Sequence, residues 1–437
     1  DPFSLEESII MRLLIQHGRV VDPVSGTVSI QDVAIEQGRV VQLERSIPED
    51  ADQIIDATGL VVCPGLVDMH VHLRDPGLTY KEDIFTGTAA AARGGVTALA
   101  CMANTDPVVD SPEQIAYIKD KAAQSNGVQV YPVGAVSVAL RGEELTDAEA
   151  LKKAGAIALS DDGCNVDNAN LMRDALIHAK RLELPVLCHC EDTSMVANRA
   201  VNEGSVSRQL WLEGRPAIAE EIMVMRDAML CEETGAHVHI CHVSTAKSVD
   251  IIRRMKKKGI PLTCETCPQY FTLTEDEILT QGSLARVNPP LRTAKDVKGI
   301  TAGLKDGTID VIATDHAPHS AEEKARPLTR APSGMVGLET FLAIALTELY
   351  HTGRMKLPEI IRRMTYTPAS ILGLTTKGRL SLGGEADVTI FDPEEEWTID
   401  PEQFVSKGRN TPFAGRKVKG KVKYTIVGGE IVYQDAQ

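Results

Sequence analysis

Six histidine and aspartate side chains lie where short apolar runs of the sequence end. The six residues are His70, His72, Asp162, His189, His242 and Asp315. Imidazole nitrogens and carboxylate oxygens are the ligands that zinc and neighbouring divalent transition metals take in proteins. One catalytic zinc needs three protein ligands, so this larger set fits two metals bridged by a carboxylate and a hydroxide. These residue types therefore indicate metal-assisted hydrolysis.

The pair His70 and His72 is the most informative part of the set. Residues two apart lie on the same face of a strand, so both imidazoles would point to one side. An exposed strand carrying two histidines is the alternative interpretation. The run LVDMHVHL that contains the pair is apolar around it, which favours a buried strand and a metal site.

Eight apolar runs of strand length alternate with longer stretches of helical pattern. The runs cover residues 66–73, 96–103, 128–136, 156–162, 185–190, 237–244, 261–267 and 311–316. Apolar strands alternating with helices indicate a parallel sheet covered on both faces, and eight of them indicate a (β/α)8 TIM barrel. The carboxyl ends of barrel strands share one face. We therefore expect the six candidate ligands to converge there.

Both ends of the chain have a different pattern, with short alternating strands separated by glycine-containing turns. The sequence predicts one small β-sandwich domain formed from both termini, with its parts at residues 11–63 and 371–437 and the barrel at residues 64–370.

Composition excludes several classes of protein. Lys and Arg number 46 against 61 Asp and Glu, a formal net charge of −15, which argues against nucleic-acid or anionic-membrane partners. No apolar run reaches the length of a membrane-spanning helix. The nine cysteines are read as reduced thiols of a cytoplasmic protein. Residues 1–10 lack the pattern of a secretory signal.

Three motifs resemble those of a known family. The segment PGLVDMHVHLR (64–74) is similar to the opening signature of cyclic amidases in the amidohydrolase superfamily, VIATDHAPH (311–319) resembles the closing signature of dihydroorotases, and SGMVGLET (333–340) follows it. The match spans nearly the whole chain. The sequence resembles the bacterial class I dihydroorotases of pyrimidine biosynthesis.

The resemblance implies a role for each candidate residue. His70, His72 and Asp315 would hold one Zn²⁺, His189 and His242 a second, with Asp162 between them. The implied substrate contacts are Arg74, Asn104 and His319 for the carboxylate and Asn288, Ser333 and Gly334 for the ring. Ser333 stands where many members carry an aromatic residue, so backbone contacts are expected from it.

Position 162 separates this chain from related enzymes. Many hydantoinases and allantoinases bridge their metals with a carboxylated lysine on the fourth strand, whereas SDDG (160–163) offers only aspartate. Asp162 is consistent with the dihydroorotase pattern. Asp161 is read as a cap or supporting group.

The implied reaction is the reversible opening of the cyclic amide of (S)-dihydroorotate to N-carbamoyl-L-aspartate. Metal-activated water would attack the ring carbonyl, and Asp315 would take its proton and deliver it to the leaving nitrogen. Arg74 suits a planar carboxylate because its guanidinium binds in a bidentate way. A salt bridge from Arg74 to Asp68 or Asp75 is the alternative.

Two other functions remain open at this point. One is a related cyclic amide hydrolase, such as an allantoinase or dihydropyrimidinase. The other is a non-catalytic partner of aspartate carbamoyltransferase, although such a chain should have lost metal ligands. An enzyme completed by that partner, and a homo-oligomer, are further expectations. Residues 320–332 lack apolar periodicity and are predicted to form a mobile loop over the site.

Overall fold

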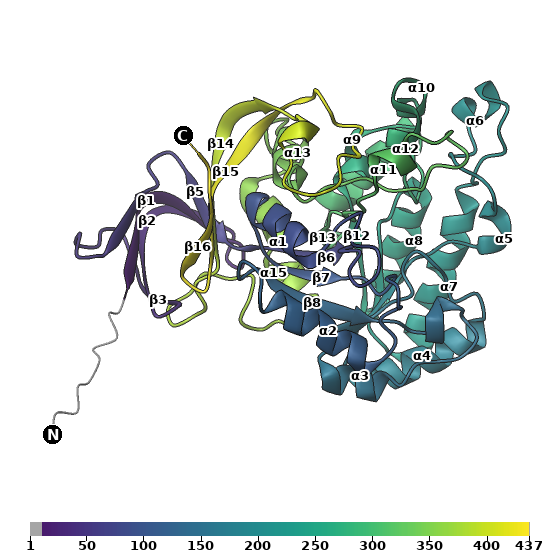
Figure 1. Ribbon diagram of the computed structural model, residues 1–437, viewed down its shortest axis with the longest axis horizontal. Coiled ribbons are helices and arrows are strands. Elements are labelled where there is room, and N and C mark those ends of the chain that lie inside the picture. The colour runs from purple at the N-terminus through teal and green to yellow at the C-terminus, as the bar shows by residue number, and fades with distance from the viewer. Residues whose placement is uncertain (1–10, 437) are drawn as a thin grey trace.

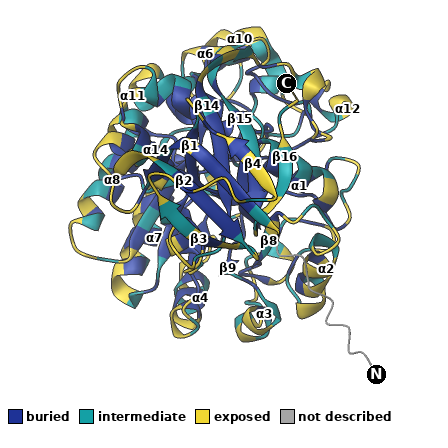
Figure 2. Cartoon of the chain, turned by 90° about the vertical axis from the view of Figure 1, so that its left-hand side faces the viewer, coloured by how far each residue is buried: buried dark blue, intermediate teal, exposed yellow. Residues whose placement is uncertain are grey.

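The computed structural model describes residues 11–436. Residues 1–10, where no secretory signal was expected, lie outside the described residues. The chain forms two sheets, a parallel barrel and a mixed sheet beside it (Figure 1). Figure 2 looks onto the mixed sheet, with the barrel helices arranged around it behind.

Eight parallel strands follow one another around the barrel in chain order. They are β6 (Leu66–Val71), β7 (Val96–Cys101), β8 (Gln129–Gly134), β9 (Ala158–Leu159), β10 (Val186–Cys188), β11 (Val238–Ile240), β12 (Leu262–Thr266) and β13 (Val311–Ile312). A bridge between Val71 and His316 joins the first strand to the segment after the last. Each strand lies within one of the eight predicted runs, so the prediction of a (β/α)8 barrel is confirmed.

Helices follow the strands and cover the outside of the barrel (Figure 1). The longer ones are α1 (Ile84–Arg93), α2 (Pro112–Ala122), α3 (Ala148–Ala154), α4 (Ala169–Arg181), α7 (Ile218–Thr234), α8 (Ala246–Lys256), α11 (Ala294–Lys305) and α14 (Leu357–Met364). Their sequence explains their place. In α4, for example, Met172, Ala175, Leu176 and Ala179 are buried, a 3–4 spacing that puts one apolar stripe against the barrel.

Shorter helical turns lie in the loops. The α-helical ones are α5 (Thr193–Val196), α6 (Ser205–Gln209), α9 (Pro268–Thr272), α10 (Glu277–Gln281), α12 (Ala321–Lys324), α13 (Phe341–Ala345) and α15 (Tyr366–Ile371). The remaining turns are η1 (Val138–Leu140), η2 (Gly282–Ala285), η3 (Leu346–Tyr350) and η4 (Pro401–Gln403).

Strands from both ends of the chain build the mixed sheet. They are β1 (Arg12–Asp22), β2 (Thr27–Glu36), β3 (Arg39–Glu44), β4 (Gln53–Asp56), β5 (Val61–Pro64), β14 (Val388–Thr398), β15 (Lys417–Val427) and β16 (Glu430–Gln434). The two ends meet where β5 pairs antiparallel with β14. The predicted domain built from both termini is therefore present, and it is a single mixed sheet. The boundaries at residues 63/64 and 370/371 stay predictions.

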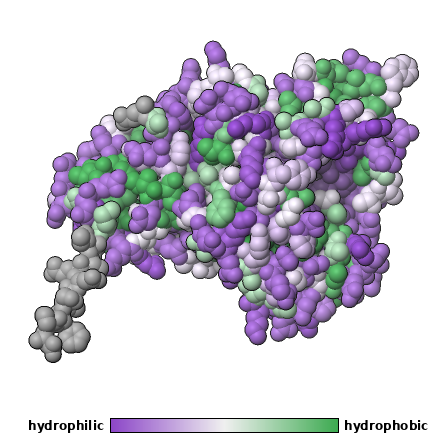
Figure 3. Space-filling view, viewed as in Figure 1, coloured by the Kyte–Doolittle hydropathy of each residue, from purple (hydrophilic) through white to green (hydrophobic). Residues whose placement is uncertain are grey.

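The visible surface is mainly hydrophilic, with a hydrophobic area over the mixed sheet (Figure 3). Within residues 11–436 no helix is long and apolar enough to cross a membrane. All nine cysteines are free, and eight of them are buried, which agrees with the prediction of reduced thiols.

Candidate metal centre and active site

The carboxyl ends of five barrel strands bring the six candidate ligands together. His70 lies within β6 and His72 directly follows that strand, whereas Asp162 follows β9. The other three follow later strands: His189 after β10, His242 after β11 and Asp315 after β13. The expected convergence is therefore observed, because parallel strands of a barrel all end at the same face.

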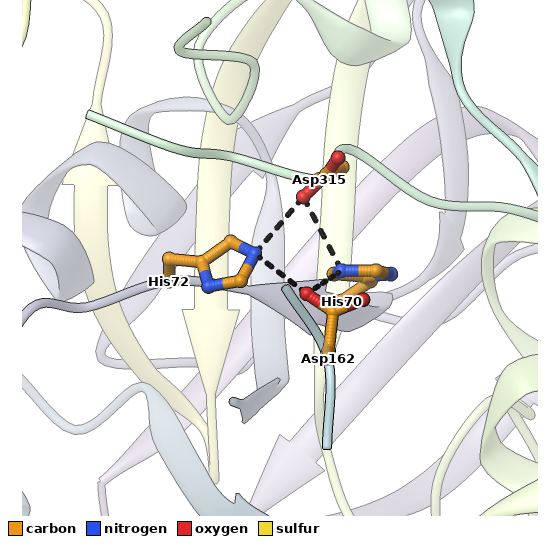
Figure 4. A group of neighbouring side chains, drawn as sticks. All are labelled: His70, His72, Asp162 and Asp315. Carbon is orange, nitrogen blue, oxygen red and sulfur yellow. Dashed lines mark hydrogen bonds and ion pairs between the residues drawn. The ribbon is translucent and has the colours of Figure 1, made fainter. Parts of the chain in front are cut away.

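The first group contains His70, His72, Asp162 and Asp315, whose ligand atoms all lie within 4.8 Å of one another. Nε2 of His70 lies 3.3 Å from Oδ2 of Asp162 and 3.2 Å from Oδ1 of Asp315. Nε2 of His72 lies 3.3 Å and 3.0 Å from the same two oxygens. Figure 4 shows these two nitrogens and two oxygens pointing toward one another. The arrangement could hold one cation at their centre.

The second group contains Asp162, His189 and His242. Oδ1 of Asp162 lies 3.4 Å from Nε2 of His242 and 3.6 Å from Nδ1 of His189. Asp162 therefore presents one carboxylate oxygen to each group. This is the geometry that a carboxylate bridging two cations requires.

Two atoms of the centre are left without hydrogen bonds. Nε2 of His70 and Oδ1 of Asp162 are buried and have no hydrogen-bond partner within the described part of the chain. Buried polar atoms are normally paired because an unpaired one costs free energy. Nitrogen and oxygen ligands so arranged fit a divalent transition metal, which would satisfy both atoms.

The electrostatics of the centre also favour a positive charge. Burial opposes protonation of His70, but Asp162, Glu265 and Asp315 outweigh it and raise its pKa well above the usual value. Burial likewise opposes ionisation of Asp162, but His70 and the other histidines hold its pKa well below the usual range. A divalent cation satisfies the same negative field that otherwise attracts protons to the histidines.

Three of the candidate residues have strained backbones. Arg74, His242 and Asp315 have positive φ angles of 59°, 34° and 50°. This region costs free energy for residues other than glycine, and such residues cluster at functional sites where the fold holds them in place.

Glu265 is a supporting residue that sequence reasoning missed. Its buried carboxylate, on β12, binds Nδ1 of His70 and lies 3.1 Å from Nε2 of His239, and it accepts from the backbone nitrogen of His242 at 3.3 Å. It therefore leaves Nε2 of His70 free for a cation. An acidic residue inside the apolar run 261–267 is a weak signal, because the sequence does not show which histidine would lie beside it.

Two further acceptors orient histidines of the centre. Nδ1 of His72 donates to Oδ1 of Asn104 at 2.8 Å, which leaves Nε2 facing the first group. Nε2 of His189 lies 3.0 Å from Oε2 of Glu191, which leaves Nδ1 facing the second group. Because the oxygen of Asn104 is used in this way, only its amide nitrogen remains for a ligand. Glu191 was not predicted from the sequence.

Arg74 is a buried guanidinium whose hydrogen bonds go to uncharged groups. Its side chain donates to the carbonyl oxygen of Pro318 at 3.1 Å and lies beside His319. No carboxylate within residues 11–436 forms an ion pair with it, so the alternative salt bridge to Asp68 or Asp75 is absent. Burial lowers the pKa of Arg74 to about 10. An unpaired buried cation is a natural contact for an anionic ligand.

Both ring nitrogens of His319 are engaged by protein groups. Nε2 donates to the carbonyl oxygen of Ser333 at 2.8 Å, and Nζ of Lys81 donates to Nδ1 at 3.2 Å. Burial, then Arg74 and Lys81, lower the pKa of His319 to about 2. The imidazole of His319 is therefore neutral. It lies between the carbonyl oxygen of Ser333 and the guanidinium of Arg74.

Gly334 lies where no side chain fits. A Cβ atom there would lie 2.9 Å from Cβ and O of Ala317 and from Nε2 of His319, and φ of Gly334 is +143°. Its N–H donates to the carbonyl oxygen of Arg286 at 2.9 Å. Ser333 uses its hydroxyl only as an acceptor from Nε of Arg286 at 3.2 Å. Backbone groups dominate this part of the site.

The side-chain amide of Asn288 forms hydrogen bonds with two neighbouring side chains of the protein. Its Oδ1 accepts from Arg215 at 2.8 Å, and its Nδ2 donates to Glu191 at 3.2 Å. Arg215 also donates to Glu191 at 2.8 Å. Asn288 thus belongs to a network beside His189, and its expected ring contact stays a prediction.

The segment 320–332 is more regular than expected. It contains α12, which begins at a capping box formed by Ser320 and Glu323. Lys324 at the end of α12 is buried. The four-residue helix was missed because a single turn carries no apolar period.

Comparison with known proteins agrees with this site. A family model described as "Dihydro-orotase-like" matches residues 59–248. A dihydroorotase of Pelotomaculum thermopropionicum is 50% identical over 425 residues, 97% of this chain and 99% of the relative. A dihydroorotase of Acetivibrio thermocellus is 48% identical over 423 residues, again 97% and 99%.

Solved structures of the same fold are more distant in sequence. An L-hydantoinase (dihydropyrimidinase) from Arthrobacter aurescens superposes with a TM-score of 0.88 at 25% identity, covering 97% of this chain and 96% of that one. A dihydropyrimidinase from Brevibacillus agri gives 0.86 at 27% identity, covering 98% and 96%. Near-full-length identity of about one half to dihydroorotases, joined to the His/Asp centre on a barrel, shows that the chain belongs to the dihydroorotase family.

Proposed function

We propose that this chain hydrolyses the cyclic amide of (S)-dihydroorotate reversibly to N-carbamoyl-L-aspartate. The observation that carries the proposal is that Asp162 offers one oxygen to each ligand group, while the buried guanidinium of Arg74 lies near enough for the charges of Asp315 and Asp162 to act on it. A metal centre of this kind suits hydrolysis of an amide, and a buried guanidinium suits binding of a carboxylate. Dihydroorotate contains both groups, a cyclic amide and a carboxylate.

His70, His72 and Asp315 would hold one zinc ion, His189 and His242 a second, and Asp162 would touch both. Bound there, zinc would lower the pKa of water toward neutrality and polarise the ring carbonyl. Glu265, Asn104 and Glu191 support this set because each accepts from, or lies beside, the ring nitrogen that points away from the centre.

Asp315 is the proposed general base and acid. Water attacks the ring carbonyl carbon while Asp315 takes a proton from it. The ring C–N bond then breaks, and Asp315 returns the proton to the leaving nitrogen, which becomes the ureido nitrogen of the product. Burial opposes ionisation of Asp315, but His70 and His72 hold its pKa below the usual range, so the carboxylate starts ready to accept a proton.

Arg74 and the amide nitrogen of Asn104 are the proposed contacts of the substrate carboxylate, with His319 beside them. Ser333 would offer backbone groups to the ring, and Gly334, whose N–H and carbonyl oxygen bind Arg286 and Lys324, would hold that backbone in place. Asn288 would act on the ring only after releasing Glu191 or Arg215, so we propose that its main contact is with this network.

The test is hydrolysis of dihydroorotate by purified protein of known metal content. Activity should disappear after chelation and return with zinc, while hydantoin and allantoin should open more slowly than dihydroorotate. Faster opening of hydantoin would favour the function in the name of the structural neighbour from Arthrobacter aurescens. Faster opening of allantoin would favour an allantoinase. Metal binding without hydrolysis of any of the three substrates would favour the non-catalytic alternative.

Homo-oligomerisation, a partnership with aspartate carbamoyltransferase and a cytoplasmic location stay predictions. Light scattering of the chain alone and of its mixture with that enzyme would test the first two. A rise in dihydroorotate hydrolysis in the mixture would support an enzyme that the partner completes.

A further inference from the structure

Lys324 stands out among the buried groups that the proposed reaction does not use. It is 4% exposed, and within residues 11–436 no carboxylate forms an ion pair with it. Its ammonium instead donates to three carbonyl oxygens, those of Pro332 at 2.8 Å, Gly334 at 3.1 Å and Arg286 at 3.2 Å. Burying a lysine in this way is costly unless its donors are satisfied.

The three carbonyls belong to two segments that are separate in the sequence, with Arg286 in one and Pro332 and Gly334 in the other. Lys324 ends α12, Arg286 directly follows η2, and Pro332 and Gly334 flank Ser333, which is proposed to face the ring. The carbonyl oxygen of Arg286 also accepts the N–H of Gly334 at 2.9 Å. One ammonium therefore ties the end of α12 to two segments of irregular backbone.

The direction of the backbone at Ser333 follows from these bonds. The carbonyls on either side of Ser333 both point to Lys324, whereas the carbonyl of Ser333 itself accepts from His319 at 2.8 Å. The carbonyls of Pro332 and Gly334 thus point toward Lys324. The carbonyl of Ser333 points the opposite way, toward His319 and the neighbouring Arg74.

We infer that Lys324 is a positioning residue that sets the orientation of the Pro332–Gly334 backbone for recognition of the substrate ring. The inference rests on the proposed function. A lysine suits this role because its flexible stem delivers a compact charge with three donors to oxygens in different directions. Burial, followed by the charge of Arg286, lowers the pKa of Lys324 to about 7, which agrees with an ammonium held by carbonyls alone.

A purely structural staple would stabilise the fold without acting on substrate recognition. The two roles differ in kinetics, because loss of ring positioning raises KM while the metal centre, which Lys324 does not touch, keeps kcat. They differ also in the response to a partial replacement. Lys324→Gln keeps two side-chain donors without a charge, so it should restore part of the recognition.

The experiment compares Lys324→Met and Lys324→Gln with the parent protein, all loaded with zinc. The matched control is Lys247→Met, since the Lys247 side chain is 65% exposed. For Lys324→Met we expect KM for dihydroorotate to rise about 10-fold or more, with kcat within about threefold and metal content unchanged. Lys324→Gln should lie between Lys324→Met and the parent, and the control should match the parent.

Unchanged KM in Lys324→Met would overturn the inference. Losses of kcat and of metal content that match the change in KM would also overturn it. So would failure of both Lys324 variants to fold, as judged by circular dichroism, because either result would give Lys324 a role in the fold alone.

A second readout needs no substrate. Amide hydrogen exchange of residues 332–334 should be faster in Lys324→Met than in the parent, and equal rates would overturn the inference. If the parent protein fails to hydrolyse dihydroorotate, the proposed function is wrong. The exchange comparison still decides separately whether Lys324 fixes this segment.

Discussion

The metal centre and the loop wall, which we define as residues 286–288 and 320–334, lie on one side of the barrel but are built differently. In the metal centre, side chains at strand ends carry the chemistry, and buried acceptors such as Glu265 orient them. In the loop wall, backbone carbonyls and N–H groups are the proposed functional groups, and side chains such as Lys324 and His319 hold them. Changing a side chain should therefore act directly in the first region and indirectly in the second.

The largest effect is expected in the metal centre. Asp315→Asn removes the proposed proton acceptor but keeps an oxygen near His70 and His72, so turnover should fall by about 1,000-fold or more while metal content stays largely intact. Steady-state kinetics and elemental analysis of the same preparation measure both. Near-normal turnover would remove Asp315 from the proton-transfer role.

The contrast between Gly334→Ala and Ser333→Ala tests the loop wall. A Cβ at position 334 would collide with Ala317 and His319, so kcat/KM should fall by about 100-fold through displaced backbone. Ser333→Ala loses only the contact with Arg286 and should stay within about threefold. If the two variants behaved alike, the claim that backbone groups dominate here would be wrong.

Glu265→Gln tests whether buried acceptors matter to the metal centre. The replacement keeps the shape but weakens the acceptor for Nδ1 of His70, and zinc affinity should fall by about 10–100-fold. Competition with a chelator of known affinity measures it. Glu323→Gln, outside the centre, is the matched control, and equal zinc affinities in all three proteins would contradict the role of Glu265.

The smallest expected effect is a change of KM with pH that arises in the loop wall. The pKa of Lys324 is lowered from 10.5 to about 7, first by burial and then by Arg286. Below this pH the side chain is a protonated ammonium with three N–H donors. As pH rises through about 7 it becomes a neutral amine, which has two donors for three carbonyl oxygens. KM should then rise about threefold between pH 6 and 8.5. His319, with a pKa of about 2, stays neutral over this range.

Lys324→Gln is the reference for that measurement because it does not titrate. Its KM should lack the rise, whereas any pH dependence that comes from the metal centre should persist in it. Identical profiles for Lys324→Gln and the parent would assign the whole dependence to the metal centre.

The sequence by itself determined much of this protein. The period of the apolar runs predicted the eight barrel strands, and the residues at their ends predicted which six side chains meet, because strands in a parallel barrel all end at one face. Alternating strands at both termini likewise predicted one small β-domain shared by the two ends, although not that it is a single mixed sheet. These features follow from local periodicity and chain direction, which are visible in one dimension.

The tertiary structure alone decided how those side chains are held. Glu191 and Lys324 gave no distinct signal, the signal of Glu265 did not name its partners, and the amide of Asn288 is turned toward Glu191 and Arg215. Their partners lie on other elements, so their roles depend on distances that only packing sets. A hydrogen bond is made or lost within less than an ångström, and no local pattern of residues fixes separations that finely between segments far apart in the chain.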